Sequence, residues 1–368
     1  MAPRAVSIVM RWARAGLAAL AGLAPLAWAT QAQAQAHTQV QAQPPMRLGG
    51  WCGAGKPILF AGITWKSGRF YTEMLRQVLE RGYGCKTGVV EGTSAETGTA
   101  LNENRLQVWV ENWGARDAIP RQGLAEGKIR MVGQLLAGGG VEGWFVPELL
   151  VKGDQRRGIQ PLAPDLKTVE DLKRYAHLFS ADGKPGSKGI FYNCLASWSC
   201  SGFNDQRLKA YGLADNFESY RPPSTAALDM LIASAVAVDR PVLFYYWYPA
   251  ALTAGHYKFV RLEEPAYNDA CWKTIANPAD PKPCGSAFKN TPLLIGVSTP
   301  FADENPALVA LLEKVQLSGD QLSKALFRMT EKRGSDTQEA LAFMARYPEA
   351  WKSWVPEAVA ARILASLR

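Results

Sequence analysis

Short apolar runs alternate with segments of helical periodicity along most of this sequence. Residues 57–63 form the first apolar run, and residues 70–81 follow with apolar side chains three and four positions apart. The same alternation predicts strands at 89–90, 106–110, 128–136, 189–192, 242–247 and 293–297, and helices at 95–104, 168–179, 203–211, 224–238 and from 303 onward. This order predicts an α/β protein with parallel sheets, whose ligand-binding groups lie beyond the carboxyl ends of the strands.

The strand expected at 293–297 comes late in the chain, which suggests that the chain crosses back to complete an earlier sheet. We therefore expect two lobes, the first made of residues 51–144 and 292–368 and the second of residues 145–291. Glycines 138–140 precede the second lobe. They favour a hinge or crossover, because neither a Lys-Ser/Thr pair nor a helix start follows them, as a phosphate-binding loop requires.

Residues 1–36 have the pattern of a secretory signal peptide. Three arginines precede an apolar run at 15–27, and small residues follow at 34–36. The run is too short to span a bilayer, and no later stretch approaches the roughly 20 apolar residues of a membrane helix. We therefore expect a periplasmic protein without membrane insertion, which begins with a disordered Gln/Ala/Pro-rich leader at 37–50.

Charge and cysteine content fit this compartment. The signal peptide carries three arginines and no acidic residue, so its removal lowers the formal net charge from +8 to +5. This mild basicity has no Lys/Arg blocks and does not favour nucleic acid as a partner. All six cysteines follow the signal peptide, which is typical of an oxidising compartment. The sequence leaves their connectivity open; because each pair closes a short segment, we expect the disulfides Cys52–Cys85, Cys194–Cys200 and Cys271–Cys284.

The sequence offers no metal, cofactor or catalytic motif. Only His177 and His256 lie within the two lobes, and no Cys-x-x-Cys spacing occurs. There is no G-x-S-x-G elbow, and cysteines held in disulfides cannot act as nucleophiles. We therefore expect a binding protein that is not an enzyme and needs no metal or cofactor.

One tryptophan, Trp198, lies between Cys194 and Cys200 in a segment too short and too broken to be a helix or a strand. If the two cysteines are bridged, the loop presents the indole ring rigidly. Two interpretations stay open for this segment alone. It is either a surface loop with a structural disulfide and a buried tryptophan, or part of a site for a ligand.

Further aromatic residues favour the ligand site. Trp65 and Trp113 follow expected strands, and Trp247 lies at the end of another. Each ring face attracts a cation by roughly 0.5 to 2 kcal/mol, so three or four rings around a trimethylammonium group supply micromolar affinity, about 8 kcal/mol. Core packing is the alternative for any one of the 12 tryptophans. Tyr246 or Tyr248 is expected at the rim of such a cage.

These segments carry a resemblance to a known family. The chain resembles the periplasmic substrate-binding proteins of glycine betaine/proline betaine ABC importers, the OpuAC-like family, over nearly its whole mature length. The matching segments are 110–113, 144–147, 193–202 with 208–213, and 241–249. The resemblance implies a two-lobed type II periplasmic binding protein fold with a ligand cleft between the lobes.

The resemblance also implies roles for individual residues. The three tryptophans of the family's ammonium cage correspond to Trp113, Trp198 and Trp247. Apart from the resemblance, we expect Trp65 to add a fourth wall. The backbone N–H groups of Ser199 and Cys200 are implied to hold the ligand's carboxylate, and the two cysteines that flank Trp198 are implied to be bridged.

One position departs from the family. Betaine binders have a histidine four residues after the first cage tryptophan, where this chain has Asp117. An aspartate repels a carboxylate unless it is protonated, but it accepts a hydrogen bond from a hydroxyl or complements a cation. Choline is therefore a candidate beside glycine betaine. If the loop instead directs Arg116 to the ligand, its guanidinium restores carboxylate binding. The alternative for both Arg116 and Asp117 is that they lie in an exposed, solvated loop.

We thus expect a monomeric periplasmic protein that captures a quaternary ammonium compound and delivers it to the permease subunit of an ABC transporter. Two other classes stay open. One is a secreted α/β enzyme that acts on a cationic substrate, with Asp117, Glu111 or His256 as its general acid or base. The other is a ligand-sensing receptor with the same fold.

Overall fold

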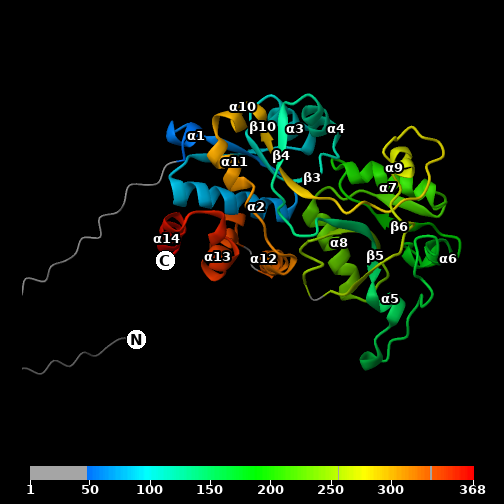
Figure 1. Ribbon diagram of the computed structural model, residues 1–368. Helices are drawn as coiled ribbons and strands as arrows, with labels where there is room; N and C mark the ends of the chain where they lie inside the picture. Colours follow the sequence, from blue (N-terminus) through cyan, green and yellow to red (C-terminus); the bar gives the residue numbers. More distant parts are fainter. Residues whose placement is uncertain (1–47, 256, 332–333) are drawn as a thin grey trace, which may run out of the picture. The chain divides into compact units, whose positions relative to one another are not determined.

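Two five-stranded sheets with flanking helices form the framework of the protein (Figure 1). The structure is a computed structural model, and it describes residues 48–255, 257–331 and 334–368. The signal peptide expected at 1–36 and nearly all of the leader expected at 37–50 lie outside the described residues.

The first sheet has the strand order β2-β1-β3-β10-β4. β1 runs parallel to β2 and β3, whereas β10 runs antiparallel to both β3 and β4. Its strands are β1 (Ile58–Gly62), β2 (Thr87–Glu91), β3 (Val108–Trp113), β4 (Ile129–Val132) and β10 (Leu293–Ser298). Helix α1 (Gly50–Gly53) precedes β1, and the helices between the strands are α2 (Lys66–Gln77) with a π-helical turn at Val78–Gly82, α3 (Ser94–Asn102) and α4 (Ala118–Ala125).

The second sheet has the order β7-β6-β8-β5-β9, and it repeats the plan of the first. β6 runs parallel to β7 and β8, and β5 runs antiparallel to β8 and β9. Its strands are β5 (Val141–Pro147), β6 (Gly189–Tyr192), β7 (Phe217–Tyr220), β8 (Leu243–Tyr248) and β9 (Phe259–Arg261). Its helices are α5 (Glu148–Lys152), α6 (Leu172–Tyr175), α7 (Ser199–Ala210), α8 (Thr225–Ala237) and α9 (Asp269–Ile275), with 3₁₀ turns at Gln155–Arg157 and Ala176–Phe179.

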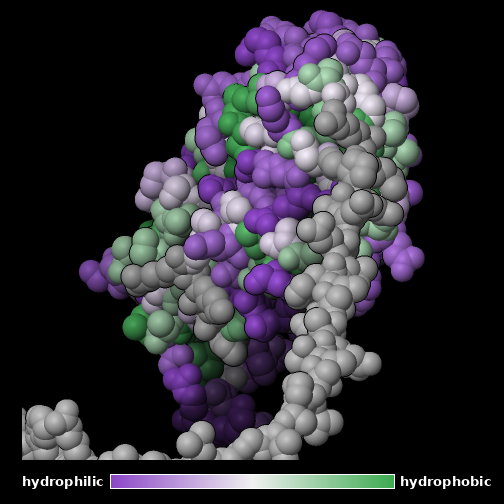
Figure 2. Space-filling model, turned by 90° about the vertical axis from the view of Figure 1, so that its left-hand side faces the viewer, coloured by the Kyte–Doolittle hydropathy of each residue, from purple (hydrophilic) through white to green (hydrophobic). Residues whose placement is uncertain are grey.

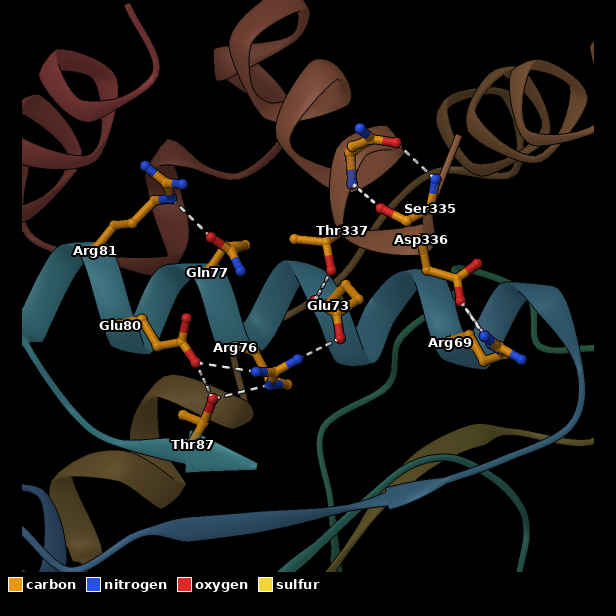
Figure 3. Close-up of polar contacts among 11 residues, drawn as sticks. Arg69, Glu73, Arg76, Gln77, Glu80, Arg81, Thr87, Ser335, Asp336 and Thr337 are labelled. Atoms are coloured by element: carbon orange, nitrogen blue, oxygen red, sulfur yellow. Dashed lines mark hydrogen bonds and ion pairs between the residues drawn. The ribbon is translucent and has the colours of Figure 1, made fainter. Parts of the chain in front are cut away.

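The rest of the chain after β10 is helical, as expected. Its elements are α10 (Thr299–Glu304), α11 (Pro306–Leu312), α12 (Gly319–Glu331), α13 (Asp336–Arg346), 3₁₀ turns at Pro348–Ala350 and Lys352–Trp354, and α14 (Glu357–Ser366). Polar contacts join α13 to α2 (Figure 3). Arg69 donates to Asp336 at 2.7 Å, and Thr337 donates to Glu73 at 2.9 Å. These contacts hold the C-terminal helices against the first sheet.

The alternation of strands and helices is confirmed, but the prediction of parallel sheets is wrong. Both sheets are mixed, because β5 and β10 are the first strands that follow each passage of the chain between the sheets, and both enter antiparallel to their neighbours. The boundary expected between residues 144 and 145 falls inside β5, all of which pairs in the second sheet. The strand expected at 128–136 ends at Val132, before Gly133 with its positive φ of 67°.

The three expected disulfides are present, joining Cys52 to Cys85, Cys194 to Cys200 and Cys271 to Cys284. Among the described residues, no helix is both long and apolar enough to cross a bilayer. On the face drawn in Figure 2, hydrophobic residues form small patches among hydrophilic ones.

A buried arginine organises the core beside the second sheet. Arg207 on α7 has no exposed side-chain surface and forms an ion pair with Glu264. Its guanidinium lies over the rings of Phe288, at 4.2 Å from the centroid, and Trp144, at 5.1 Å. Asn204 accepts a further hydrogen bond from Arg207 at 3.1 Å. The charge is therefore held by one carboxylate and by the faces of aromatic rings.

We expect Glu264→Gln to lower the free energy of unfolding by about 3 kcal/mol, because it leaves a buried charge without its ionic partner. Urea unfolding measures the change. The matched control is Asp239→Asn, which removes the acidic partner of the exposed Arg157 and should leave the free energy of unfolding almost unchanged. Equal losses in the two variants would contradict this account of Arg207.

Candidate functional site

One cavity is lined by residues from elements of both sheets. From the first sheet come Trp65, Ser94, Trp109, Trp113, Arg116 and Asp117, and from the second come Trp198, Ser199, Tyr245 and Trp247. The space between them amounts to about 430 Å³, including open solvent at its mouth. All four tryptophans singled out in the sequence therefore line a single cavity, together with two further aromatic residues.

Two of these tryptophans are N-cap residues of helices that follow equivalent strands of the two sheets. Trp65 is the N-cap residue of α2, the helix that follows β1, and Trp198 is the N-cap residue of α7, the helix that follows β6. Their rings meet edge to face, with centroids 5.9 Å apart. Trp198 also meets Trp247 edge to face at 5.3 Å. Such contacts favour a fixed orientation of the rings.

The start of α7 differs from the prediction. The sequence indicated an irregular loop up to residue 202, but the helix begins at Ser199. The Cys194–Cys200 disulfide ties the preceding loop to the first turn of this helix. N–H groups in a first turn have no acceptor within the helix, and Ser199 lines the cavity. Cys200 is fully buried and is not among the lining residues.

Tyrosines on β8 face in opposite directions, because side chains alternate along a strand. Tyr245 lines the cavity beside Trp247, whereas the hydroxyl of Tyr246 donates to Asp229 on α8 at 2.7 Å. Neither Tyr246 nor Tyr248 is among the lining residues. The tyrosine that lines the cavity is thus Tyr245, one residue before the expected Tyr246. Because side chains two residues apart lie on the same face of a strand, the position of Trp247 indicates Tyr245.

Glu111 lies at an irregularity of β3 behind the cavity wall. The register between β3 and β10 shifts there, and Glu111 has a positive φ of 60°. Its side chain is fully buried. The carboxylate accepts hydrogen bonds from the Ser67 hydroxyl at 2.9 Å and from the indole N–H of Trp113 at 3.2 Å. Its second oxygen has no hydrogen-bond partner among the described residues.

Burial raises the pKa of Glu111 to about 8, although interactions with Ser67, Trp113 and Trp65 favour its ionised form. The indole N–H of Trp65 makes no hydrogen bond of normal geometry. It nevertheless lies close enough to Glu111 to lower the pKa of that carboxyl. A carboxyl group that titrates near neutral pH thus lies directly behind two rings of the cavity.

An ion pair joins the two sheets beside the cavity. Arg116, in the loop after β3, donates to Glu142 on β5, and the Tyr245 hydroxyl donates to the other oxygen of the same carboxylate. The Arg116 guanidinium also lies over the Trp113 ring, 5.2 Å from its centroid. Arg116 is therefore half-buried and paired with Glu142, although its Nε–H has no hydrogen-bond partner among the described residues and the residue lines the cavity.

Asp117 differs from these groups because its carboxylate has no partner. It is half-buried at the N-cap position of α4, makes no capping hydrogen bond and lines the cavity. No hydrogen bond or ion pair of its side chain occurs among the described residues. The cavity therefore presents aromatic faces, a carboxylate that makes no hydrogen bond or ion pair among the described residues, and an arginine paired with Glu142.

Further polar contacts connect the sheets around the cavity. The Trp198 indole N–H donates to Thr64 at 2.8 Å, and the Thr225 hydroxyl donates to the Thr64 carbonyl at 2.7 Å. Lys66 at the start of α2 pairs with Asp229 on α8 at 2.8 Å. Closure of the two sheets around the cavity thus rests on a few hydrogen bonds and ion pairs.

A larger, more open hollow of about 1540 Å³ lies along residues 147–162 and 236–241. No tryptophan lines it, and its lysines and arginines make it a poor site for a cation. No group of three or more His, Cys, Asp or Glu side chains in the described ranges is arranged to hold a metal ion. Of the acid–base candidates, Asp117 lines the aromatic cavity, Glu111 lies behind it, and His256 is outside the described residues.

Comparison with known proteins supports the resemblance found in the sequence. A family model described as the substrate binding domain of ABC-type glycine betaine transport system matches residues 56–346. A glycine betaine/L-proline-binding protein (ProX) from Borrelia burgdorferi is similar in structure, with a TM-score of 0.64 at 16% identity, over 84% of this chain and 100% of that one.

Two further solved structures are similar. One is an ABC-transporter choline binding protein in complex with choline, with a TM-score of 0.65 at 18% identity, over 86% of this chain and 99% of that one. The other is lactococcal OpuAC complexed with glycine betaine, with a TM-score of 0.62 at 12% identity, over 82% of this chain and 100% of that one. The fold is therefore that of two-lobed periplasmic binding proteins, as expected from the sequence.

We expect Asp229→Ala to weaken the connection between the sheets by about 1 kcal/mol, because Lys66 at the start of α2 loses its ionic partner on α8. Small-angle X-ray scattering of the unliganded protein should then give a larger radius of gyration. Asp320→Ala, which removes an ion pair within α12, is the control and should leave the radius unchanged. An unchanged radius in Asp229→Ala would show that this contact does not hold the sheets together.

Proposed function

The chain belongs to the family of substrate-binding domains of ABC-type glycine betaine transport systems, and we propose that its aromatic cavity captures a quaternary ammonium compound. It is a substrate-binding protein of an ABC importer, so a captured ligand is delivered to the permease subunit. The observation that carries the proposal is the meeting of Trp65, Trp113, Trp198 and Trp247 around one cavity.

The chemistry of the cavity suits a quaternary ammonium group. Such a group offers no N–H donor, so hydrogen-bond acceptors recognise it poorly, whereas the faces of tryptophan rings attract it electrostatically. Because the rings come from both sheets, a ligand between them stabilises the closed arrangement over an open one. Ligand binding then shifts the equilibrium toward the closed arrangement, and the permease distinguishes loaded from empty protein by its shape.

Charge within the cavity favours choline over glycine betaine. Asp117 is free to accept a hydrogen bond from the choline hydroxyl, and Arg116 is already neutralised by Glu142. A betaine carboxylate would meet the N–H groups at the start of α7 but also the unpaired charge of Asp117. We therefore propose choline as the preferred ligand, with glycine betaine as the weaker one.

We further propose export to the periplasm with removal of residues 1–36, and action as a monomer. The disulfides support an oxidising compartment. We propose lobes that follow the two sheets, with residues 51–144 and 292–368 as the first lobe, except that β5 belongs to the second. The family is one of solute-binding proteins, and no described arrangement favours an enzyme or a sensory receptor in its place.

We expect Trp198→Ala to weaken choline binding by at least about tenfold, because it removes a ring face and the contacts that orient two others. Calorimetric titration of ligand-stripped protein measures this loss. Trp272→Ala is the matched control, since Trp272 is half-buried against Phe203 and Phe288 outside the cavity. Equal affinity in the Trp198 variant and the wild type would refute the aromatic site.

We expect Asp117→Asn to reverse the preference between ligands. Choline should bind about tenfold more weakly, because a hydrogen bond to a charged acceptor becomes one to a neutral amide. Glycine betaine should bind more tightly, because a repulsive charge is removed. Titrations of both ligands test the ratio of their affinities, and an unchanged ratio would rule out Asp117 as the selective group.

A further inference from the structure

Glu111 is held in place at a conformational cost. Only a few per cent of residues other than glycine adopt a positive φ, and Glu111 does so at the register shift between β3 and β10. The result of this conformation is a carboxyl group with no exposed surface, directed to Ser67 and the indole N–H of Trp113. The sequence offered Glu111 only as an acid–base candidate for an enzyme.

No cation in the described part of the chain neutralises this carboxyl group. No ion pair includes it, its second oxygen has no hydrogen-bond partner, and no positive side chain contributes to its ionisation. Burying an unpaired carboxylate is costly. The aromatic cavity, which Trp113 and Trp65 line, is a place where a bound cation can supply the compensating positive charge.

We infer that Glu111 is the buried counter-charge of the bound ammonium group, and that ligand capture therefore expels a proton from the protein. This inference rests on the proposed function. In the empty protein Glu111 is mainly protonated at neutral pH, whereas a fixed positive charge behind two rings favours its carboxylate. The carboxylate in turn makes the indole that donates to it richer in electrons, which strengthens the attraction of the ring face for the cation.

The sign of the pH dependence follows from this coupling. Because the ligand prefers the ionised form, affinity is lowest at acidic pH, rises as pH passes through the pKa of about 8 of the empty protein, and levels off above it. A neutral ligand of the same shape would show no such rise. The ligand itself does not titrate, since a quaternary ammonium group keeps its charge at every pH.

Other titratable groups near Glu111 do not supply this effect. Tyr71 on α2 has a pKa well above 10, because of burial and because of Glu111 itself, so its hydroxyl stays neutral. Arg116 is paired with Glu142, and Tyr245, whose pKa is likewise raised by burial and by Glu142, stays protonated. Asp117 is the remaining carboxylate of the cavity, and the variant Asp117→Asn separates its contribution.

The test is the dependence of affinity on pH, measured with the full chain. Calorimetric titrations with choline and with tetramethylammonium from about pH 6 to pH 9.5 give the affinity. Repetition in buffers of different ionisation enthalpy gives the number of protons released. We expect affinity to rise about tenfold between pH 6.5 and pH 8.5, with release approaching one proton per ligand near pH 7.

Two substitutions assign the effect to Glu111. Glu111→Gln, which keeps the size and hydrogen-bonding capacity of the side chain, should give an affinity that is independent of pH and no linked proton release. Ser67→Ala removes a hydrogen bond that favours the ionised form, so the midpoint of the rise should move to higher pH. Asp117→Asn should weaken choline binding but keep the rise.

The outcomes separate this inference from the proposed function. Binding that does not change with pH in the wild type overturns the role of Glu111 and leaves the aromatic cavity intact. The same rise in Glu111→Gln also overturns it. If that variant fails to fold, an unmoved midpoint in Ser67→Ala overturns the inference instead. If neither cation binds at any pH, both the inference and the proposed function fail.

Discussion

A quaternary ammonium group can be held tightly only by several aromatic faces that approach it from different sides, because it has no hydrogen to donate and its charge is spread over methyl groups. A single sheet presents side chains in only two directions. The arrangement of this protein meets the requirement with two sheets of the same strand order. Trp65 and Trp198 are the N-cap residues of the helices that follow the equivalent strands β1 and β6, and Trp113 and Trp247 come from the ends of the equivalent strands β3 and β8. The cavity is thus built from two equivalent pairs of rings.

Charged groups lie at two depths around these rings, some lining the cavity and one behind the rings. At the cavity, the Asp117 carboxylate makes no hydrogen bond or ion pair among the described residues, and Arg116 is paired with a carboxylate that also accepts from Tyr245. Behind the rings, Glu111 is buried without a cationic partner. The two carboxyl groups, Asp117 and Glu111, support the proposal of a positively charged ligand. Because Arg116 and Glu142 come from different sheets, the same pair that removes a positive charge from the cavity also connects its two sides.

The tryptophans of the cavity and the three disulfides were predictable from the sequence. Trp65, Trp113, Trp198 and Trp247 were expected at one site because each follows or ends a predicted strand, and because the last three match the cage tryptophans of the family that the chain resembles. In the structure all four line one cavity. Tyr246 or Tyr248 was expected at the cavity, but Tyr245 lines it. The alternation of side chains along β8 places Tyr245 on the same face as Trp247, so the sequence was sufficient to identify it. The three disulfides followed from short sequence separation.

Other features depend on contacts that a linear pattern does not contain. The helix start at Ser199 follows a segment that looks irregular, and the disulfide that ties it to its loop is a tertiary contact. The pairing of Arg116 with Glu142 joins residues of different sheets. The irregularity that turns Glu111 inward arises from the register between β3 and β10, strands far apart in the sequence. The antiparallel entry of β5 and β10 likewise follows from the chain crossing between sheets.

The position of a bound ammonium group tests this account most directly. Arsenocholine carries arsenic in place of the quaternary nitrogen, so diffraction data from crystals grown with it, collected at the arsenic absorption edge, locate that atom without interpretation of a ligand shape. We expect one dominant anomalous peak in the cavity, between the rings of Trp113, Trp198 and Trp247. A dominant peak elsewhere, such as in the basic hollow beside Arg156 and Arg240, or no peak at saturating ligand, would contradict it.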